Sequence, residues 1–458
     1  MIDSPLRAPS GIRAAAALVL ACAWCAPGIS LFSQTHSFRK IAESGGGTTY
    51  IDPAPAINEE GAVAYIRESE GGLKGVYAKP RQGTEIRIAD NTGPLQDFSG
   101  VRIDRSGRVC FRASRDAGGS GIYAGSGGTL EVIAETGPVY SALAEGPAMN
   151  QAGAIAFRAT LANGRSALCL HAGGATSVIA DSGGSFQTFT ATPALSESGV
   201  IAFAALLDNG TSGIYSSDGQ TLKTLAQTSP THVAWTDPSI SATGRILSLA
   251  FRDDGILEMV SFSGTAREVV AETGDIFSSF GRPLLNSSGE FIFTAYRNGV
   301  GSGLYAGPFP RPGTILQRRE KLFSGRVYDV QISTQSFNEE GEVAFAYELD
   351  NGLTGIAVAA PIPRRPSLFL TGNSRVALKR SLLTLRGSAI AEGGLSAVIV
   401  SYRQLGKGKK ETRRYASVTG QTWNFKFRPD AARTTLTIRA IDLEGQSSPP
   451  VEVEVFRR

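Results

Sequence analysis

The chain has 458 residues, of which only 19% are charged, and it contains 54 glycines against 22 prolines. Such a composition favours an all-β protein with many turns over a helical one. The formal net charge of +4 is unevenly spread, because residues 361–458 carry +11 and the first 360 residues carry −7. This asymmetry indicates a basic module attached to an acidic body.

The N-terminus has the pattern of a secretory signal. Arg7 and Arg13 precede the apolar run AAAALVLACAWCAPG, which ends in small residues. We therefore interpret residues 1–33 as a signal peptide and leader, and expect the mature protein to be secreted or held in the cell envelope. The sequence VLAC, ending at Cys22, leaves a lipoprotein anchor as the less favoured alternative. The Pro-Gly pair that ends the run argues against an uncleaved membrane anchor.

A short motif ending in glycine recurs seven times, at steps of 46, 46, 46, 45, 45 and 52 residues. Three residues before each glycine stands a side chain that can accept a hydrogen bond from a backbone N–H two residues on, and the glycine supplies a positive φ. This is the chemistry of a tight hairpin turn. The pairs are Asn58 and Gly61, Asp104 and Gly107, Asn150 and Gly153, Ser196 and Gly199, Ser241 and Gly244, Asn286 and Gly289, and Asn338 and Gly341.

Each repeat holds up to four short β-prone segments, which we name A to D. In the first repeat they are PAIN, VAYI, GVYA and EIRIAD. Four short strands in about 46 residues predict one blade of a propeller, so residues 37–360 are expected to form a seven-bladed β-propeller. Long stretches such as ETGPVYSALAEG are expected to cross between blades. In five repeats a proline lies six residues before the turn glycine, which places strand A at the inner edge because proline cannot donate to a ladder.

The last repeat lacks a strand D, whereas SFRKIAESGG near the N-terminus resembles a strand D without a blade of its own. These two deficits match. We therefore expect residues 37–42 to pair beside residues 354–359 and to close the ring, which removes an unpaired sheet edge.

The turn sequences also carry a family resemblance. NEEGAVAY, NQAGAIAF and NEEGEVAF have the signature NxxGxxAF, DRSGRVCF, SESGVIAF and NSSGEFIF come near to it, and SATGRILSLAF departs most. From about Phe38 to Ala360 the chain resembles bacterial exported proteins built from tandem NxxGxxAF repeats. The resemblance implies an exported propeller-like protein and implies no particular chemistry.

Residues 361–366, PIPRRP, read as a stiff linker between domains. Beyond them, residues 367–458 contain about seven alternating strands, which predicts a β-sandwich. The segments LTLRGSA and TLTIRAIDLEGQSS, with a tryptophan between them, are similar to bacterial Ig-like domains. That similarity implies that Trp423 anchors the core and that the domain serves as a spacer or adhesive module.

The cysteines and histidines point away from metal or nucleophilic chemistry. Cys110 and Cys169 stand where other repeats have alanine or tyrosine, so we interpret them as buried hydrophobic residues. His36, His171 and His232 are scattered without ligand spacing. We expect no cofactor and assign no catalytic residue.

Carboxylates follow strand D in five repeats, with Gln227 in the sixth. In a closed ring they would share one face, where they are weak candidates for a cation site; the favoured alternative is that each caps its own turn. The carboxylates are Glu43, Asp90, Glu135, Asp181 and Glu272.

The loops between strands B and C vary between repeats, so we predict that they form a ligand site together with the D–A loops. The candidate ligand-binding residues are Arg67, Glu70, Arg115, Asp116, Asn163, Arg165, Asp208, Asp253, Asp254, Arg297 and Asp350.

In the second domain, GKGKKETRR at residues 406–414 could attract polyanions such as surface polysaccharide or lipid headgroups, although a solvated hairpin is the favoured interpretation. Its basic residues are Lys407, Lys409, Lys410, Arg413 and Arg414. Nucleic acid is not an expected partner of an exported protein.

These observations lead to one main hypothesis and two alternatives. The main hypothesis is a non-enzymatic binding or scaffold protein of the envelope or extracellular space, with a polysaccharide or another envelope protein as partner. The first alternative is a carbohydrate-active hydrolase or lyase that uses paired carboxylates on the propeller face. The second is a purely structural spacer.

Overall fold

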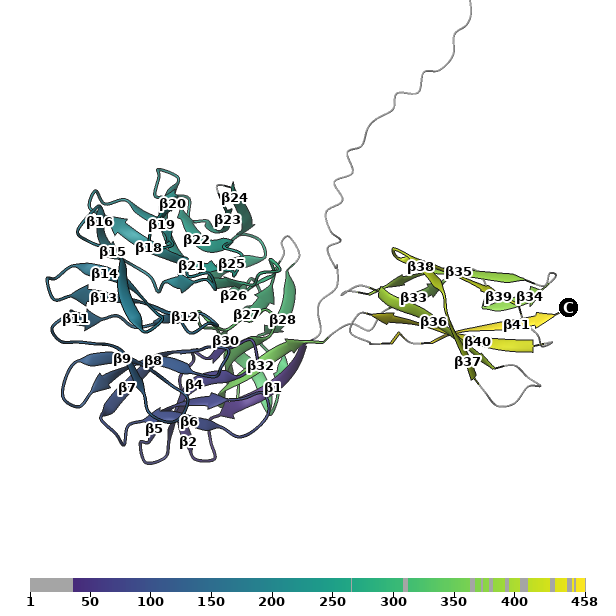
Figure 1. Ribbon diagram of the computed structural model, residues 1–458, viewed down its shortest axis with the longest axis horizontal. Helices are drawn as coiled ribbons and strands as arrows, with labels where there is room; N and C mark the ends of the chain where they lie inside the picture. Colours follow the sequence, from purple (N-terminus) through teal and green to yellow (C-terminus); the bar gives the residue numbers. More distant parts are fainter. Residues whose placement is uncertain are drawn as a thin grey trace, which may run out of the picture.

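The computed structural model describes residues 36–458 except 265, 308–311, 363–366, 372–373, 379–381, 392–394, 404–410, 429–432, 443–446, 449 and 458. The described residues form strands, turns and loops, so the fold is all-β as predicted (Figure 1). In this part of the chain no helix has the length and apolar character needed to span a membrane. The expected leader, residues 1–33, lies outside the described residues.

The described residues from His36 to Pro361 form seven antiparallel sheets, and we number them 1 to 7 in the order in which the chain enters them from β2 onward. Sheet 1 consists of β2 (Thr48–Ile51), β3 (Ala56–Ile57), β4 (Val63–Ser69), β5 (Lys74–Lys79) and β6 (Ile86–Asp90). Sheet 2 consists of β7 (Leu95–Ile103), β8 (Val109–Arg115), β9 (Ser120–Gly125) and β10 (Glu131–Glu135). Sheet 3 consists of β11 (Tyr140–Leu143), β12 (Ala148–Met149), β13 (Ile155–Leu161), β14 (Ser166–Ala172) and β15 (Ala175–Asp181).

The remaining sheets repeat this order. Sheet 4 consists of β16 (Phe186–Phe189), β17 (Ala194–Leu195), β18 (Ile201–Leu207), β19 (Ser212–Ser217) and β20 (Leu222–Gln227). Sheet 5 consists of β21 (His232–Ile240), β22 (Ile246–Arg252), β23 (Leu257–Ser263) and β24 (Ala266–Glu272). Sheet 6 consists of β25 (Phe277–Leu285), β26 (Phe291–Arg297), β27 (Gly301–Ala306) and β28 (Gly313–Gln317). Sheet 7 consists of β29 (Lys321–Leu322), β30 (Gly325–Gln331), β31 (Val343–Leu349), β32 (Thr354–Pro361) and β1 (His36–Glu43).

The first strand of each sheet reaches further back along the chain than expected. The stretch ETGPVYSALAEG was expected to cross between sheets, but β11 lies within it and pairs with β13. Leu143 at the end of β11 is buried in the core of sheet 3, and burial of this side chain favours the pairing. The crossing is therefore limited to residues 136–139. The five prolines do lie in or beside these first strands, at a sheet edge, as predicted.

The two ends of the seven-sheet region pair with each other, which confirms the predicted contact. Strand β1 runs antiparallel to β32, with Lys40 opposite Ala357 and Ala42 opposite Ile356. Phe38 of β1 packs edge-to-face on Phe345, with ring centroids 6.1 Å apart. Sheets 1 and 7 also share one apolar cluster, so the first and last repeats are neighbours in space (Figure 1).

The repeated turn, which directly precedes β4, β8, β13, β18, β22, β26 and β31, is built as predicted, with one difference in detail. All seven glycines have φ between 72° and 89°. Asn58 Oδ1 accepts from the backbone N–H of Glu60 at 3.1 Å and also from that of Ala62 at 2.8 Å. The bond to the N–H four residues on occurs in every repeat, whatever the side chain. The side chain therefore spans the whole turn rather than half of it.

Asparagine does more than cap the turn, because its amide also has donors. Asn58 Nδ2 donates to the Asp104 carbonyl of sheet 2 at 2.7 Å. Asn150 reaches Ser196 of sheet 4 at 3.1 Å, and Asn338 reaches Asn58 of sheet 1 at 3.1 Å. These buried bonds link adjacent sheets at their inner ends.

Residues 367–457 form two further sheets, with nine strands rather than the seven expected. The strands are β33 (Ser367–Leu370), β34 (Arg375–Leu378), β35 (Leu383–Ile390), β36 (Leu395–Arg403), β37 (Glu411–Tyr415), β38 (Ser417–Thr419), β39 (Thr422–Phe427), β40 (Arg433–Asp442) and β41 (Val451–Arg457). The first sheet has the order β33-β35-β39-β38, and the second has the order β34-β41-β40-β36-β37. Trp423 is only 2% exposed in the core that both sheets contribute to, as predicted.

Deleting residues 37–42 should sharply lower the melting temperature or cause aggregation, because β32 would become an unpaired edge and Phe345 would lose an aromatic neighbour. Thermal denaturation of the mature protein and light scattering would measure this. A deletion variant that stays monomeric and melts with the parent would contradict a role for β1 in closing sheet 7.

Replacing Asn58 by serine should lower the melting temperature by about 2–4 °C, because serine can cap the turn but cannot donate to Asp104. Asn286→Ser is the matched control, since the Asn286 amide donates to Glu290 within its own sheet. Equal losses in the two variants would show that the bond between sheets adds nothing to turn capping.

Candidate functional site

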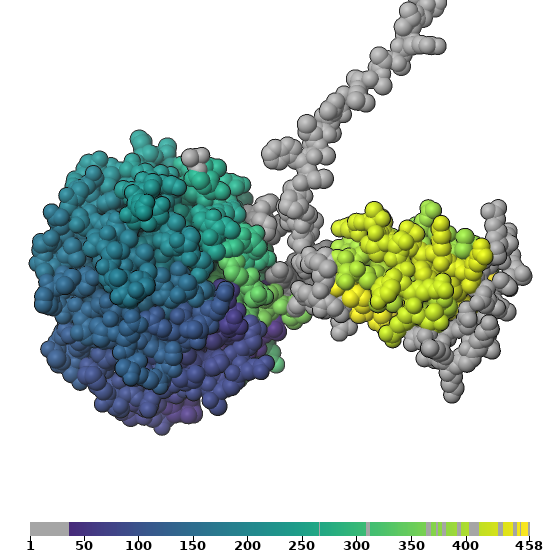
Figure 2. All heavy atoms as spheres, in the orientation of Figure 1, coloured from purple at the N-terminus to yellow at the C-terminus, as the bar shows by residue number. Residues whose placement is uncertain are grey.

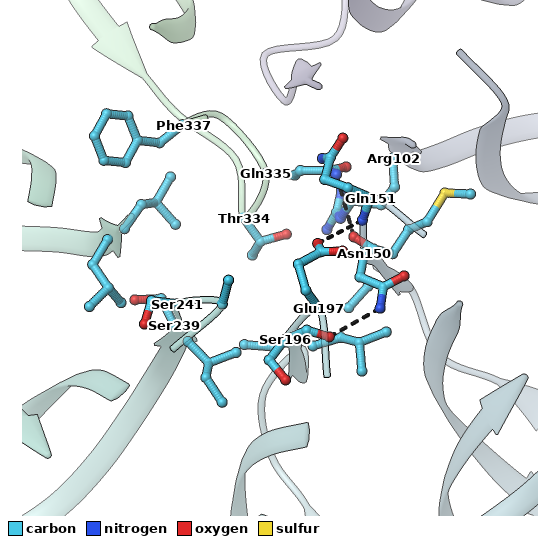
Figure 3. A pocket seen from close by; sticks show the side chains of 18 of the residues that line it. Arg102, Asn150, Gln151, Ser196, Glu197, Ser239, Ser241, Thr334, Gln335 and Phe337 are labelled. Carbon is cyan, nitrogen blue, oxygen red and sulfur yellow. Dashed lines mark hydrogen bonds between the residues drawn. The ribbon is translucent and has the colours of Figure 1, made fainter. Parts of the chain in front are cut away.

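A cavity of about 360 Å³ lies where the inner strands and repeated turns of all seven sheets meet (Figure 3). Each sheet contributes at least one lining residue. One from each, in order, gives Glu59, Arg102, Met149, Leu195, Ser239, Leu284 and Gln335. Because every repeat reaches this space, we call it the axial cavity.

In each repeated turn, the residue directly after the capping side chain lies at the rim of the axial cavity. These residues are Glu59, Arg105, Gln151, Glu197, Ala242, Ser287 and Glu339. Several of these side chains bind the backbone of a turn in another sheet. The Glu339 carboxylate accepts from Ser287 N at 2.7 Å, and Glu59 accepts from Glu339 N at 2.9 Å. Glu197 accepts from Gln151 N at 2.8 Å. The three rim carboxylates are thus used to join turns.

Gln335 bridges one side of the cavity. Its side-chain amide accepts from Ile103 N at 2.9 Å and donates to the Ile103 carbonyl at 2.8 Å, and its main-chain carbonyl accepts from Ile57 N at 2.8 Å. One residue of sheet 7 therefore satisfies edge groups of sheets 1 and 2. Five other repeats have a proline at the position of Gln335. Proline has no backbone N–H and no side-chain amide, so it cannot donate such hydrogen bonds.

Two arginines lie deeper than the rim. Arg102 is 4% exposed, and its Nη1 donates to the Val101 carbonyl at 2.5 Å. Burial, with a contribution from the charge of Arg282, lowers the pKa of Arg102 to about 10, so the guanidinium is still charged at neutral pH. Arg282 forms an ion pair with Asp237 of the neighbouring sheet. Asp237 has φ of 52°, a left-handed conformation that glycine adopts at the same repeat position in sheets 2 and 3.

Two hydroxyl groups in the cavity wall have no hydrogen-bond partner. They are Thr334 Oγ1 and Ser239 Oγ, both buried. Figure 3 shows the Thr334 side chain projecting toward the middle of the cavity, with Ser239 among the residues around it. Buried polar atoms are almost always satisfied in folded proteins, so these two hydroxyls are exceptions beside the cavity.

The predicted loop residues lie elsewhere. In each sheet an N–H of the B–C loop donates to a carbonyl of the D–A loop, over 2.8–3.3 Å, so the two kinds of loop do meet. Many of the charged side chains pair locally: Arg67 with Glu85, Arg115 with Glu135, and Arg165 with Asp181. None of the eleven predicted residues lines the axial cavity, and Asp350 borders a separate hollow with Arg318, Arg319 and Arg326. A ligand site in these loops stays a prediction.

The carboxylates that follow strand D do not converge. Asp90 and Asp181 accept from the N–H groups two residues on, at 3.0 Å and 2.7 Å, as the capping interpretation predicts. The bond from the Thr92 hydroxyl lowers the pKa of Asp90. Glu43 and Glu135 instead accept from tyrosine hydroxyls, each at 2.9 Å. Within the described residues no group of three or more His, Cys, Asp or Glu is placed to hold a metal ion.

Cys110 and Cys169 are unpaired, and both thiols are buried in the core of sheets 2 and 3. Burial raises the pKa of the Cys110 thiol to about 12 and that of Cys169 to about 11. Both therefore behave as apolar residues, as predicted. In the second domain, Arg413 and Arg414 are exposed on β37, and Lys407, Lys409 and Lys410 lie outside the described residues.

Sequence reasoning missed the axial cavity and Arg102. The signal was present in the repeat register, because five residues before the turn glycine the other repeats have Ala, Ser or Leu. Arg102 is the exception at this position, and an alignment of the seven repeats would have revealed it.

Comparison with known proteins adds little chemistry. A family of unknown function, DUF7453, matches residues 103–315. No curated protein matches the sequence.

Several solved structures share low similarity with the chain. A fungal lectin from Aleuria aurantia, described as a six-bladed β-propeller with a fucose recognition mode, is 9% identical; the match covers 58% of this chain and 95% of the lectin, with a TM-score of 0.34. PorZ, a surface component of the type-IX secretion system of Porphyromonas gingivalis, is 11% identical over 89% of this chain and 70% of its own, with a TM-score of 0.31. An uncharacterized protein from Listeria monocytogenes is 9% identical over 65% of this chain and 88% of its own, with a TM-score of 0.40. Scores at this level carry no conclusion about ligand.

If the carboxylates after strand D serve only as caps and tyrosine partners, removal of divalent cations should leave the melting temperature unchanged. Thermal scans of the mature protein with and without EDTA, after dialysis, would test this. A fall of several degrees in EDTA, restored by added calcium, would contradict the capping interpretation.

Proposed function

We propose that this chain is an exported, non-enzymatic binding protein whose ligand site is the axial cavity of a closed seven-bladed propeller, with an Ig-like domain as its second module. The observation that carries the proposal is the cavity itself. It is lined by all seven sheets and contains a buried guanidinium and two hydroxyls without partners. Burying polar groups without partners is energetically unfavourable, and a purely structural role does not account for such groups beside the axial cavity.

Binding fits the cavity better than hydrolysis does. Glycoside hydrolysis needs two carboxyl groups free to act as acid and base or nucleophile across the scissile bond. The rim carboxylates Glu59, Glu197 and Glu339 instead accept hydrogen bonds from backbone N–H groups of other turns. Such bonds hold these carboxylates as structural acceptors.

Two further parts of the proposal rest on sequence. Export to the envelope or extracellular space is supported by the charged and apolar pattern of residues 1–33, together with the resemblance to NxxGxxAF-repeat proteins. The closed propeller is supported by the seven sheets and by the pairing of β1 with β32.

Blocking the mouth of the axial cavity should abolish ligand binding. Ala242 lies exposed at the rim, so Ala242→Trp should fill the opening without disturbing the core. We expect ligands found for the mature protein on a glycan and metabolite panel to lose binding at least tenfold in this variant, as measured by calorimetry.

The matched control is Ala117→Trp, which puts the same side chain in an exposed B–C loop. Full binding by Ala242→Trp with loss in Ala117→Trp would move the site to the loops. Charge reversal of Arg115 and Asp253 tests the same point. If neither change alters the affinity for the ligand, the ligand does not bind at the loop residues predicted from the sequence.

A further inference from the structure

Arg102 is a buried cation without an acidic partner among the described residues. Among the described residues, fourteen contacts of arginine, lysine or histidine with acids are spread over the molecule, yet none involves Arg102. Its one recorded hydrogen bond is to the adjacent Val101 carbonyl. Removing a charge from water is unfavourable unless a counter-charge is supplied nearby.

The surroundings of Arg102 favour a negative group. Arg282 adds a second positive charge close enough to lower the pKa of Arg102. Its own partner, Asp237, holds it in place from the neighbouring sheet. Thr334 and Ser239 line the same cavity, their hydroxyls have no hydrogen-bond partner among the described residues, and a hydroxyl can donate to an oxyanion.

We propose that the axial cavity binds a small oxyanionic ligand, with its carboxylate or sulfate group on the Arg102 guanidinium. This inference rests on the proposed use of the axial cavity as the ligand site and names the chemistry of that ligand. A guanidinium presents a planar set of donors that matches a carboxylate or sulfate in a bidentate arrangement.

The cavity also limits the size and charge of the ligand. Its volume of about 360 Å³ suits a monosaccharide-sized molecule. The rim carries three carboxylates, of Glu59, Glu197 and Glu339, against one arginine, Arg105. A long polyanion would have to place further charges beside these carboxylates, whereas a ligand with one charged end places it on Arg102 and its neutral part at the rim.

Calorimetric titration of the mature protein at low ionic strength would test the inference with three probes: sodium glucuronate, glucose and inorganic sulfate. Glucuronate and glucose share a ring and differ in the carboxylate. We expect glucuronate and sulfate to bind, and glucose to bind at least tenfold more weakly or not at all.

Arg102→Met keeps much of the side-chain volume without the charge, and binding of both anions should fall at least tenfold. Arg102→Lys keeps the charge without the planar donors and should recover part of the affinity. Arg326→Met is the control, because it removes one exposed arginine from the separate hollow near Asp350 and should bind the anions like the parent.

Three results would overturn the inference: no binding of either anion by the parent protein, equal binding of glucose and glucuronate, or unchanged anion binding by Arg102→Met. If Arg102→Met fails to fold, the comparison of glucose with glucuronate on the parent protein still decides. A neutral ligand that Ala242→Trp excludes and Arg102→Met retains would leave the axial cavity as the ligand site and reject only its proposed anion chemistry.

Discussion

The structure depends on the asparagine side chain of the repeated turn, which forms hydrogen bonds through both its oxygen and its nitrogen. In three of the seven repeated turns, the asparagine oxygen accepts from the backbone N–H four residues on, while its nitrogen donates to a backbone carbonyl of the next sheet. The same residue thus closes a hairpin and fixes how two sheets meet. Serine and aspartate at this position keep the first bond but cannot make the second, because a carboxylate has no donor and a hydroxyl is too short. The junction of sheets 7 and 1, where the chain ends meet, has the amide bond of Asn338 and the carboxylate bond of Glu59 as well.

Much of this frame could be predicted from the sequence, because repetition multiplies weak local signals. A single Asn-x-x-Gly turn predicts only a local hairpin. Seven such turns at a nearly constant step predict the strand order, the number of sheets, and the pairing of the extra N-terminal strand with the last repeat, which lacks its fourth strand. Even SATGRILSLAF, the copy that departs most, forms the same turn, since Ser241 Oγ accepts from Arg245 N at 3.2 Å. The prediction erred where two signals overlapped. The residues of β11 lie in a stretch rich in turn-forming residues, so that their pairing with β13 depends on burial of Leu143 rather than on local sequence.

The candidate site was harder to predict, because it is made of departures from the repeat. Variation among the B–C loops directed the sequence prediction to another part of each repeat, and solvent-exposed loops also vary because they are little constrained. At the inner edge, where most copies have a small residue after a proline, Arg102 and Gln335 are the exceptions. Both residues line one cavity although they lie far apart in the sequence. Their proximity follows from the arrangement of whole sheets, which no local pattern contains.

The pairing of β1 with β32 also sets an order in time. Strand β1 is the first described part of the chain to be synthesised, and its partner is the last strand of the seven-sheet region. At ordinary elongation rates the first strand therefore waits for tens of seconds before its partner exists. During this interval β1 is an unpaired strand that could join another chain, and its Arg39 and Lys40 place two charges where they oppose such pairing. The pairing of β1 with β32 consequently has to wait for the last strand of the seven-sheet region, and this delay is a property of the chain's connectivity rather than of its stability.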